Sequence, residues 1–495
     1  MYYQSKKTIE WKKNDYTRTI LLFALHTFII VLLYGVMLFW NAYRAEVDTA
    51  EFLTKKETIS KLLYVAIAVV LLAAGIYLYF FNENKDFILR SKNIHLVFII
   101  IEVSILAMYI TGLYLNVKSR PFALCALLML LLINKRSAIF INGVICIYVF
   151  LADAFLAVSS AADVSVYSAL VINYTTSLLA IYIVGRVSSR LKVFVTGFII
   201  AVPIALSYAV LDFNTFLLKP WQAALDGLWS GMLSVVLMMA FLPFFEKCFN
   251  VLTDYRLMEI TDHKSLLIKA LIENAPGTFN HSLVVSTLAE SCATAIGENP
   301  LLARACAYYH DIGKLKQPEF FTENQKGYNP HNELTPELST DIIRSHTKDG
   351  YDLIRKYHLP QILADVARQH HGTMPIRYFY AKAMKYTEGE LDIENFSYPG
   401  PKPQTKIAAI IMIADGCEAK VRTLPERSHE KVDAAVREII EERMDLGQFD
   451  ECDITMSDLD IIRKTITNSL AGVYHDRVVY PKLKLGQKDK IKVNE

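Results

Sequence analysis

The sequence predicts an all-α protein in which a multi-span helical membrane region precedes an all-helical cytoplasmic domain. The 495 residues are 53% hydrophobic, with a mean hydropathy of +0.27, which is unusual for a soluble chain. Charged residues are unevenly divided, because 33 of them lie in residues 1–245 and 69 in residues 246–495. Beyond residue 246 the apolar residues recur at helical spacing, without the alternation that indicates strands.

About eight membrane spans are expected in residues 1–245, because one bilayer crossing needs about 20 predominantly apolar residues. The apolar stretches are 20–40, 62–81, 94–115, 122–133, 138–158, 164–184, 193–211 and 222–245. The fourth stretch is short, so it is compatible with a thin span or a re-entrant segment.

The orientation of these spans follows from the Lys and Arg residues in the short loops. The N-terminal tail carries five basic residues, and further basic groups follow spans two, four and six. The loops after spans five and seven are poor in Lys and Arg, although the loop after span one goes against the trend. An even number of spans with the N-terminus in the cytoplasm also returns the C-terminal half to the cytoplasm.

Three carboxylates lie inside predicted spans, namely Glu102, Asp153 and Asp226. A charge inside a bilayer is costly, so one interpretation is a role in sensing an ion or a ligand. The other is that each lies near a span end or is protonated against a neighbouring helix. The sequence leaves both open.

The charged half divides into a connecting helix or pair of helices (246–273), a helical domain (274–480) and a basic tail (481–495). A net charge of +2 and the lack of a continuous basic face exclude a nucleic-acid polymer as a partner. The seven cysteines form no CxxC pair and are odd in number, which indicates reduced thiols rather than a disulfide framework.

Histidine placement is the most informative feature of this half, since seven of the twelve histidines lie between residues 281 and 371. Gly and Pro positions predict five helices there and beyond, the first opened by His281 and stopped by Gly297. Each helix directs a potential metal ligand into the core. These ligands are His281, His310 with Asp311, His346, His370 with His371, and Asp415.

Five imidazoles and two carboxylates in one core predict a metal centre, because burying them without a cation would be costly. Nitrogen and oxygen ligands without cysteine favour Mn, Fe or another first-row divalent ion over structural zinc. Seven ligands are too many for one ion, whereas one bridging Asp with three further ligands on each of two ions accounts for all seven. Two ions roughly 3.5–4 Å apart are typical of phosphoester hydrolysis.

The order His281, His310-Asp311, Asp415 resembles the H…HD…D pattern of the HD-domain metal-dependent phosphohydrolases. The chain is most similar to the branch called seven-transmembrane receptors with an intracellular HD hydrolase, which includes cyclic-di-AMP phosphodiesterases of the PgpH type. The similarity covers about residues 274–480. It is carried by the stretches Glu273–Ser282, Ala307–Lys314, Phe321–Gln325, Asn329–His331, His370–Thr373, Tyr398–Thr405, Ala414-Asp415 and Asp450–Asp453.

The resemblance implies a phosphodiesterase of the bacterial inner membrane that opens cyclic di-AMP to pApA and so controls a second messenger. One ion would be held by His281, His310, Asp311 and Asp415, and the other by Asp311, His346, His370 and His371. Asp311 and Lys314 would be catalytic, with Lys314 also a candidate substrate contact, although Lys314 could instead be a solvated or structural lysine. His331 is a candidate substrate contact, its alternative being turn chemistry. A homodimer formed through the connecting helix is left open.

One departure from the family is that only about 20 residues (Asn41–Lys61) separate the first two spans, where members usually carry a large extracytoplasmic domain. We therefore expect the spans themselves, or a cytoplasmic effector, to receive the regulatory signal. The nearest alternative is hydrolysis of cyclic di-GMP, but the Gly-Tyr-Pro signature of those enzymes does not follow His371. A hydrolase of guanosine tetraphosphate or deoxynucleotides and a non-catalytic nucleotide-binding receptor are further alternatives.

Overall fold

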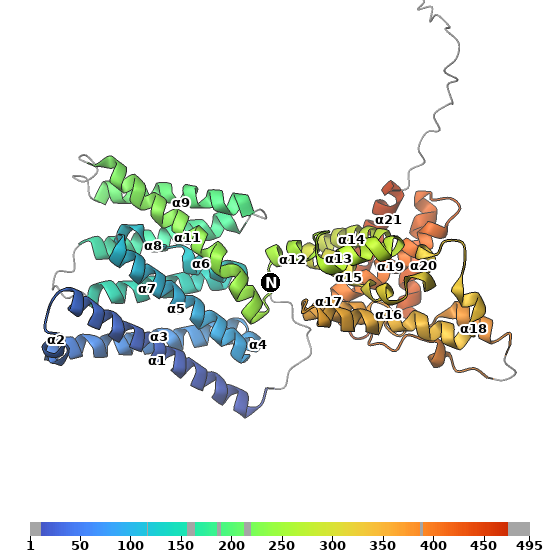
Figure 1. Ribbon diagram of the computed structural model, residues 1–495, viewed down its shortest axis with the longest axis horizontal. Helices are drawn as coiled ribbons and strands as arrows, with labels where there is room; N and C mark the ends of the chain where they lie inside the picture. Colours follow the sequence, from blue (N-terminus) through green and yellow to red (C-terminus); the bar gives the residue numbers. More distant parts are fainter. Residues whose placement is uncertain are drawn as a thin grey trace, which may run out of the picture. The chain divides into compact units, whose positions relative to one another are not determined.

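The computed structural model describes residues 11–115, 117–155, 164–185, 190–211, 219–386 and 390–473. The chain forms two compact units, a first unit of Met1–Arg256 and a second unit of Leu257–Glu495 (Figure 1). The predicted all-α class is confirmed: within the described ranges there is no strand, only an isolated bridge between Pro375 and Ser397. The predicted basic tail, 481–495, lies outside the described residues.

Helices occupy each of the eight apolar stretches in the first unit. They are α1 (Lys13–Arg44), α3 (Lys56–Glu83), α5 (Ser91–Tyr114), α6 (Leu124–Leu132), α7 (Lys135–Phe155), α8 (Val164–Val184), α9 (Arg190–Leu211) and α11 (Pro220–Phe249). Between them lie the short pieces α2 (Thr49–Thr54), α4 (Lys85–Ile88) and the 3₁₀ turn η1 (Val117–Ser119). Helix α1 packs against α3 and α5, and α9 packs along α11 (Figure 1).

Five of the described helices are long and apolar enough to cross a membrane, which indicates a membrane protein. They are α1, α3, α5, α7 and the part Ala224–Phe249 of α11. Helix α6 has only nine residues, as the short fourth stretch predicted, and the apolar parts Leu170–Val184 and Leu191–Ser207 of α8 and α9 are shorter than a full crossing. Apolar side chains such as Leu21 on α1 and Leu71 on α3 are exposed, as lipid contact requires. The number of spans and their orientation stay predictions.

The segment predicted as a connecting helix or a pair of helices, 246–273, is divided among three helices. It contains the end of α11, then α12 (Asp254–Ile260) and most of α13 (Leu266–Asn274). Asn250 adopts a left-handed conformation, with φ of 47°, and this ends α11. The Thr253 hydroxyl then accepts a hydrogen bond from the Arg256 backbone N–H and starts α12. Local capping therefore breaks a stretch whose apolar spacing is continuous.

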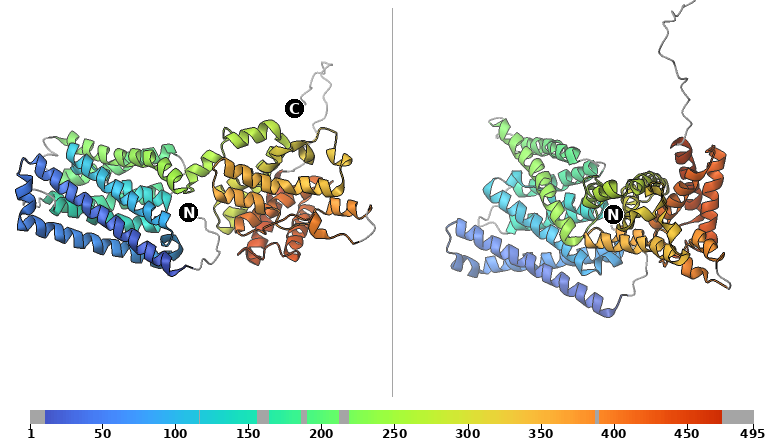
Figure 2. Two further views of the ribbon diagram at one scale, coloured as in Figure 1. Left: turned by 60° about the horizontal axis from the view of Figure 1, so that its bottom comes forward. Right: turned by 45° about the vertical axis from the view of Figure 1, so that its right-hand side comes forward.

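The second unit is built from helices around α14 (Pro276–Ile296), which packs against α15, α19 and α21. Figure 2 shows its last two helices side by side in red. Its other helices are α15 (Pro300–Tyr309), α16 (Pro336–Lys356), α17 (Gln361–Gln369), α18 (Arg377–Ala383), α19 (Lys406–Thr423), α20 (His429–Asp445) and α21 (Met456–Val473). Its 3₁₀ turns are η2 (Ile312–Lys316), η3 (Pro318–Phe320), η4 (Thr322–Asn324), η5 (Pro330–Glu333) and η6 (Ile393–Phe396).

The helix ends in the second unit follow the signals in the sequence. Gly297 takes the left-handed conformation, with φ of +78°, that ends α14. The side chains of Asn299, Thr335 and Thr405 accept backbone N–H groups and cap α15, α16 and α19. One boundary differs: α14 begins at Pro276, so His281 lies in its second turn rather than opening the helix. Pro is favoured at this first position because it needs no hydrogen-bond partner there.

Candidate metal centre

The second unit brings together all seven residues that the sequence singled out as metal ligands. One group contains Asp311, His346, His370 and His371, and the other contains His281, His310 and Asp415. Within each group the potential ligand atoms lie within 4.8 Å of one another. The ligands come from α14, α16 and α19 and from the C-terminal ends of α15 and α17, which are elements far apart in sequence.

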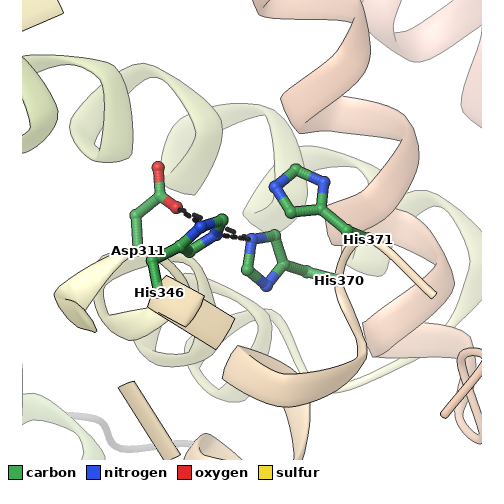
Figure 3. Close-up of side chains that lie close together, drawn as sticks. All are labelled: Asp311, His346, His370 and His371. Carbon is green, nitrogen blue, oxygen red and sulfur yellow. Dashed lines mark hydrogen bonds and ion pairs between the residues drawn. The ribbon is translucent and has the colours of Figure 1, made fainter. Parts of the chain in front are cut away.

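Asp311 lies between the two groups and presents one carboxylate oxygen to each. Its Oδ1 lies 3.4 Å from His346 Nε2 and 3.6 Å from His370 Nε2 (Figure 3). Its Oδ2 lies 3.4 Å from His310 Nε2 and 3.7 Å from His281 Nε2. A carboxylate in this position has the geometry of a bridging ligand, because each oxygen can contact a different ion.

Gly313 explains how α16 comes close enough to place His346 beside Asp311. A Cβ atom at Gly313 would lie 2.0 Å from the His346 carbonyl oxygen and 2.5 Å from the Gly350 nitrogen. Real Cβ atoms do not approach backbone that closely, so any other residue would push α16 away. Gly313, just after His310-Asp311, therefore allows the close contact with α16, a helix that begins more than twenty residues later.

Three of the histidines are held in the same orientation by the local helix geometry. His310, His346 and His370 each donate Nδ1–H to the carbonyl oxygen three residues earlier, over 2.6, 2.5 and 2.8 Å. This fixes the tautomer in which Nε2 carries a lone pair, and it turns each Nε2 toward the centre. The backbone thus preorganises these rings as ligands.

The centre contains more hydrogen-bond acceptors than donors to pair with them. His346 Nε2 lies 3.3 Å from His370 Nε2, and two lone pairs this close repel unless a cation or a proton lies between them (Figure 3). His310 Nε2 and Asp311 Oδ1 are buried and have no hydrogen-bond partner among the described residues. Buried acceptors left in this state are rare, so the residues present fit a divalent metal site.

Glu418 supports His281 from behind, and the sequence did not single it out. Its Oε2 accepts the His281 Nδ1–H over 2.7 Å, while His281 Nε2 lies 3.0 Å from Asp415 Oδ1. Burial lowers the pKa of His281, but the hydrogen bonds to Asp415 and Glu418 outweigh burial and raise the pKa to about 10. A carboxylate behind a ligating histidine orients the ring and increases its basicity. Its position three residues after Asp415 on α19 was the available signal, because such residues share a helix face.

Lys314 is buried beside Asp311 and is held by a second carboxylate that the sequence also left unassigned. Its Nζ lies 2.7 Å from Asp311 Oδ2 and 2.8 Å from Glu323 Oε1. Burial lowers the pKa of Lys314, but both carboxylates raise it above its usual value. Thr278 donates to the same Glu323 oxygen over 3.0 Å and fixes it. Lys314 is therefore a charged group at the centre and not a solvated surface lysine.

Charge at the centre is unevenly distributed among the ligands. Burial opposes ionisation of Asp311, but Lys314 and His310 hold its pKa well below the usual range. Burial lowers the pKa of His346 to about 3. Near neutral pH the centre thus combines an ionised carboxylate with a neutral imidazole, and these are the forms that coordinate metals.

Tyr398 covers one side of the centre. Its ring stacks on His371 with ring centroids 4.3 Å apart and meets His346 edge-on at 5.9 Å. Burial raises the pKa of the Tyr398 hydroxyl above its usual value, so the group is a neutral donor. The Pro-rich segment Tyr398–Thr405 thus lines the site at one end and, through Thr405, caps α19 at the other.

His331 lies apart from both ligand groups. Its Nε2–H donates to the Phe320 carbonyl oxygen over 3.0 Å, and its ring packs against Phe320 and Phe379. Its Nδ1 is buried without a partner among the described residues. A contact with substrate at this residue stays a prediction.

Two family models match the chain. The model described as 7TM receptor with intracellular HD hydrolase matches residues 59–253, and the model described as HD domain matches residues 278–420. The first match covers most of the apolar helices, and the second contains all seven ligands of the centre.

Two curated relatives carry the name cyclic-di-AMP phosphodiesterase PgpH. The protein of Bacillus subtilis is 36% identical over 427 residues, which are 84% of this chain and 59% of the relative. The protein of Listeria monocytogenes is 35% identical over 433 residues, which are 84% of this chain and 58% of the relative. The chain thus spans about three fifths of the length of these relatives.

A solved structure also matches the second unit. The crystal structure of the L. monocytogenes phosphodiesterase PgpH HD domain in complex with cyclic di-AMP is 49% identical, with a TM-score of 0.41. The match covers 43% of this chain and 99% of the other.

Proposed function

Because the chain belongs to the family of 7TM receptors with an intracellular HD hydrolase, we propose that it is a membrane-anchored phosphodiesterase that opens cyclic di-AMP to pApA. The observation that carries this proposal is Asp311, whose two oxygens face two separate groups of buried ligands. The names of the two PgpH relatives support cyclic di-AMP as the substrate. By lowering the concentration of this nucleotide, the protein would control a second messenger.

The seven ligands would hold two divalent ions. His281, His310 and Asp415 with Asp311 would hold one, and His346, His370 and His371 with Asp311 would hold the other. Five imidazole nitrogens and two carboxylates, with no thiolate among them, favour Mn or Fe. Bound divalent ions supply an activated water and neutralise charge on a transferring phosphoryl group.

Asp311 and Lys314 are the proposed catalytic residues. Asp311 spans both ligand groups, so its carboxylate sets the spacing at which a phosphodiester meets them. Lys314 places a fixed positive charge 2.7 Å from that carboxylate, where it can stabilise the negative charge that develops on the phosphoryl group. Glu323 keeps the Lys314 ammonium in this position. Tyr398 covers one side of the site by stacking on His371.

The membrane orientation belongs to the proposal as well. Basic residues in the N-terminal tail and in alternate loops support a cytoplasmic N-terminus at the bacterial inner membrane. With eight spans the second unit would also lie in the cytoplasm. A homodimer stays a prediction.

A side-by-side assay of two cyclic dinucleotides tests the proposed function. The purified full chain in lipid nanodiscs with Mn²⁺ is incubated with cyclic di-AMP or cyclic di-GMP, and the linear products are separated by chromatography. We expect pApA to form faster than the corresponding product of cyclic di-GMP. Faster cleavage of cyclic di-GMP, or binding of cyclic di-AMP without turnover, would contradict the proposal.

A matched pair of histidine variants links turnover to the centre. His370→Ala removes a buried ligand and should abolish pApA formation. His429→Ala removes an exposed histidine of α20 and should leave the rate unchanged. Full activity of His370→Ala would show that the ligand assignment is wrong.

A further inference from the structure

The first unit contains a cavity of about 190 Å³ that no part of the proposed function uses. It lies near the C-terminal ends of α1, α5 and α7, where Asn41, Gly112 and Asp153 line it. Most of its wall is apolar, including Met37, Ile105 and Met108. Pockets for drug-sized molecules have volumes of roughly 300–1,000 Å³, so this cavity suits a smaller ligand.

A buried ion pair forms the polar part of the cavity wall. Arg120 Nη1 lies 2.6 Å from Asp153 Oδ2, and Nη2 lies 2.9 Å from Oδ1. The two side chains are only 8% and 14% exposed. This bidentate pair places a positive and a negative charge side by side at the edge of an apolar chamber.

Arg120 is held in place at two points, its backbone and its guanidinium. The Ser230 hydroxyl donates to the Arg120 carbonyl oxygen over 2.6 Å and anchors the backbone. A Cβ atom at Gly112 would lie 2.5 Å from Arg120 Nε, so the guanidinium lies directly on this glycine. The pair is therefore preorganised before any ligand arrives.

The hydrogen bonds of the pair are incompletely used. Arg120 Nη1 and Nη2 each donate one N–H to Asp153, which leaves one further N–H on each nitrogen, while Nε is buried against Gly112. Each Asp153 oxygen accepts one bond from Arg120, which leaves further lone pairs on the carboxylate. An acceptor for Arg120 and a donor for Asp153 are what a ligand would have to bring.

We propose that this cavity binds a small zwitterion with an apolar body, of the class of an α-amino acid with an aliphatic side chain. The ligand carboxylate meets Arg120, its ammonium meets Asp153, and its side chain packs among Met37, Ile105 and Met108. A ligand with a single charge would leave an uncompensated charge in a low-dielectric site, whereas a zwitterion adds no net charge to the ion pair. On the orientation proposed above, the helix ends that form the cavity face the extracytoplasmic side.

Binding of L-leucine and two single-charge analogues tests this proposal. The probes are L-leucine, 4-methylpentanoate, which lacks the ammonium, and 3-methylbutylamine, which lacks the carboxylate. Binding to the full chain in nanodiscs is measured by isothermal titration calorimetry and by the shift in Tm, without reference to hydrolysis. We expect saturable binding of leucine at least tenfold tighter than that of either analogue. Failure of leucine, isoleucine, valine and methionine to bind, or equal binding of the analogues, would overturn the proposal.

A matched pair of variants locates the bound amino acid. Ala152 lines the cavity, so Ala152→Leu should fill it and abolish leucine binding without removing the ion pair. Ala74 is exposed on α3 and lies outside the cavity, so Ala74→Leu should bind leucine as the unaltered chain does. Asp153→Asn is the direct test of the ammonium contact and should weaken binding at least tenfold. Unchanged binding by Ala152→Leu, in a chain whose circular dichroism shows native helicity, would place the ligand elsewhere and refute the assignment.

Discussion

In the first unit the three carboxylates of the predicted spans each meet a neighbouring side chain, whereas in the second unit seven ligand side chains converge on one centre. Asp153 pairs with Arg120 at 2.6 Å, Glu102 with His26 at 2.8 Å, and Asp226 accepts from Ser119 over 2.8 Å. In the second unit His310 Nε2 and Asp311 Oδ1 are buried and have no hydrogen-bond partner among the described residues.

The difference separates two reasons for burying charge. The charge of a carboxylate with its own donor is compensated within the fold, so the carboxylate can serve structure or bind a ligand of matching charge. Several hydrogen-bond acceptors directed at one position repel one another, so the arrangement requires a cation. Surplus lone pairs, rather than burial alone, are what indicate the metal centre.

The largest effect is expected from Asp311→Ala, which removes a ligand from both groups at once. We expect turnover of cyclic di-AMP to fall by roughly 10³-fold or more, or about 4 kcal/mol of transition-state stabilisation. Rates of pApA formation in the full chain measure this loss. Asp341→Ala on the exposed side of α16 is the control and should keep full activity. A fall below tenfold would show that Asp311 does not bridge the two groups.

Breaking the ion pair between Arg120 and Asp153 in the first unit should lower the stability of the fold. Arg120→Met leaves Asp153 buried without its partner, so we expect a loss of about 3 kcal/mol in the free energy of unfolding. The double variant Arg120→Met/Asp153→Leu removes both charges and should recover most of that loss. Thermal unfolding in detergent measures both. If the double variant is less stable than Arg120→Met, the pair is not compensated as described.

The candidate ligands could be singled out from the sequence because each one follows from a local pattern. His310-Asp311 lies at the end of a short helix, and His346 shares a helix face with Ser339 and Ile343, so position along one helix was sufficient. Which side chain of another helix lies behind a ligand does not follow from such a pattern. Glu418 behind His281 was therefore missed, and so was the stacking of Tyr398 on His371.

The same limit applied to the first unit. Arg120 stood next to Pro121 at the edge of an apolar stretch and looked like a boundary residue of a span. Only the packing of η1 against α5 and α11 shows that it is buried. The intramembrane carboxylates could be found from the sequence, but their partners could not.

Glu418→Gln should have an intermediate effect, because it weakens a ligand without removing it. Loss of the carboxylate behind His281 typically lowers metal affinity about 10–100-fold. We expect the Mn²⁺ concentration needed for half-maximal activity to rise by that factor, with full rates regained at excess Mn²⁺. Asp311→Ala should not be rescued in this way. Glu438→Gln, at an exposed position of α20, is the control. An equal shift in the half-maximal Mn²⁺ concentration of that variant would contradict a specific role for Glu418.

The smallest effect is expected where a carboxylate of the second unit pairs with a partly exposed lysine. Lys406 Nζ lies 2.9 Å from Asp458 Oδ2 and joins the start of α19 to α21. Lys406→Met should lower the free energy of unfolding by only about 0.5 kcal/mol, because the pair is partly exposed and screened by salt.

This small effect should depend on pH. Burial raises the pKa of Asp458, but the hydrogen bond with Lys406 outweighs burial and lowers the pKa below its usual value. A lowered pKa stabilises the fold above the unfolded pKa of about 3.9 and loses that effect as the carboxylate is protonated, so the difference between the variant and the unaltered chain should shrink below about pH 4. Urea unfolding at pH 7 and pH 3.5 checks this, and a loss as large as that of Arg120→Met would mean that exposure does not separate the two kinds of pair.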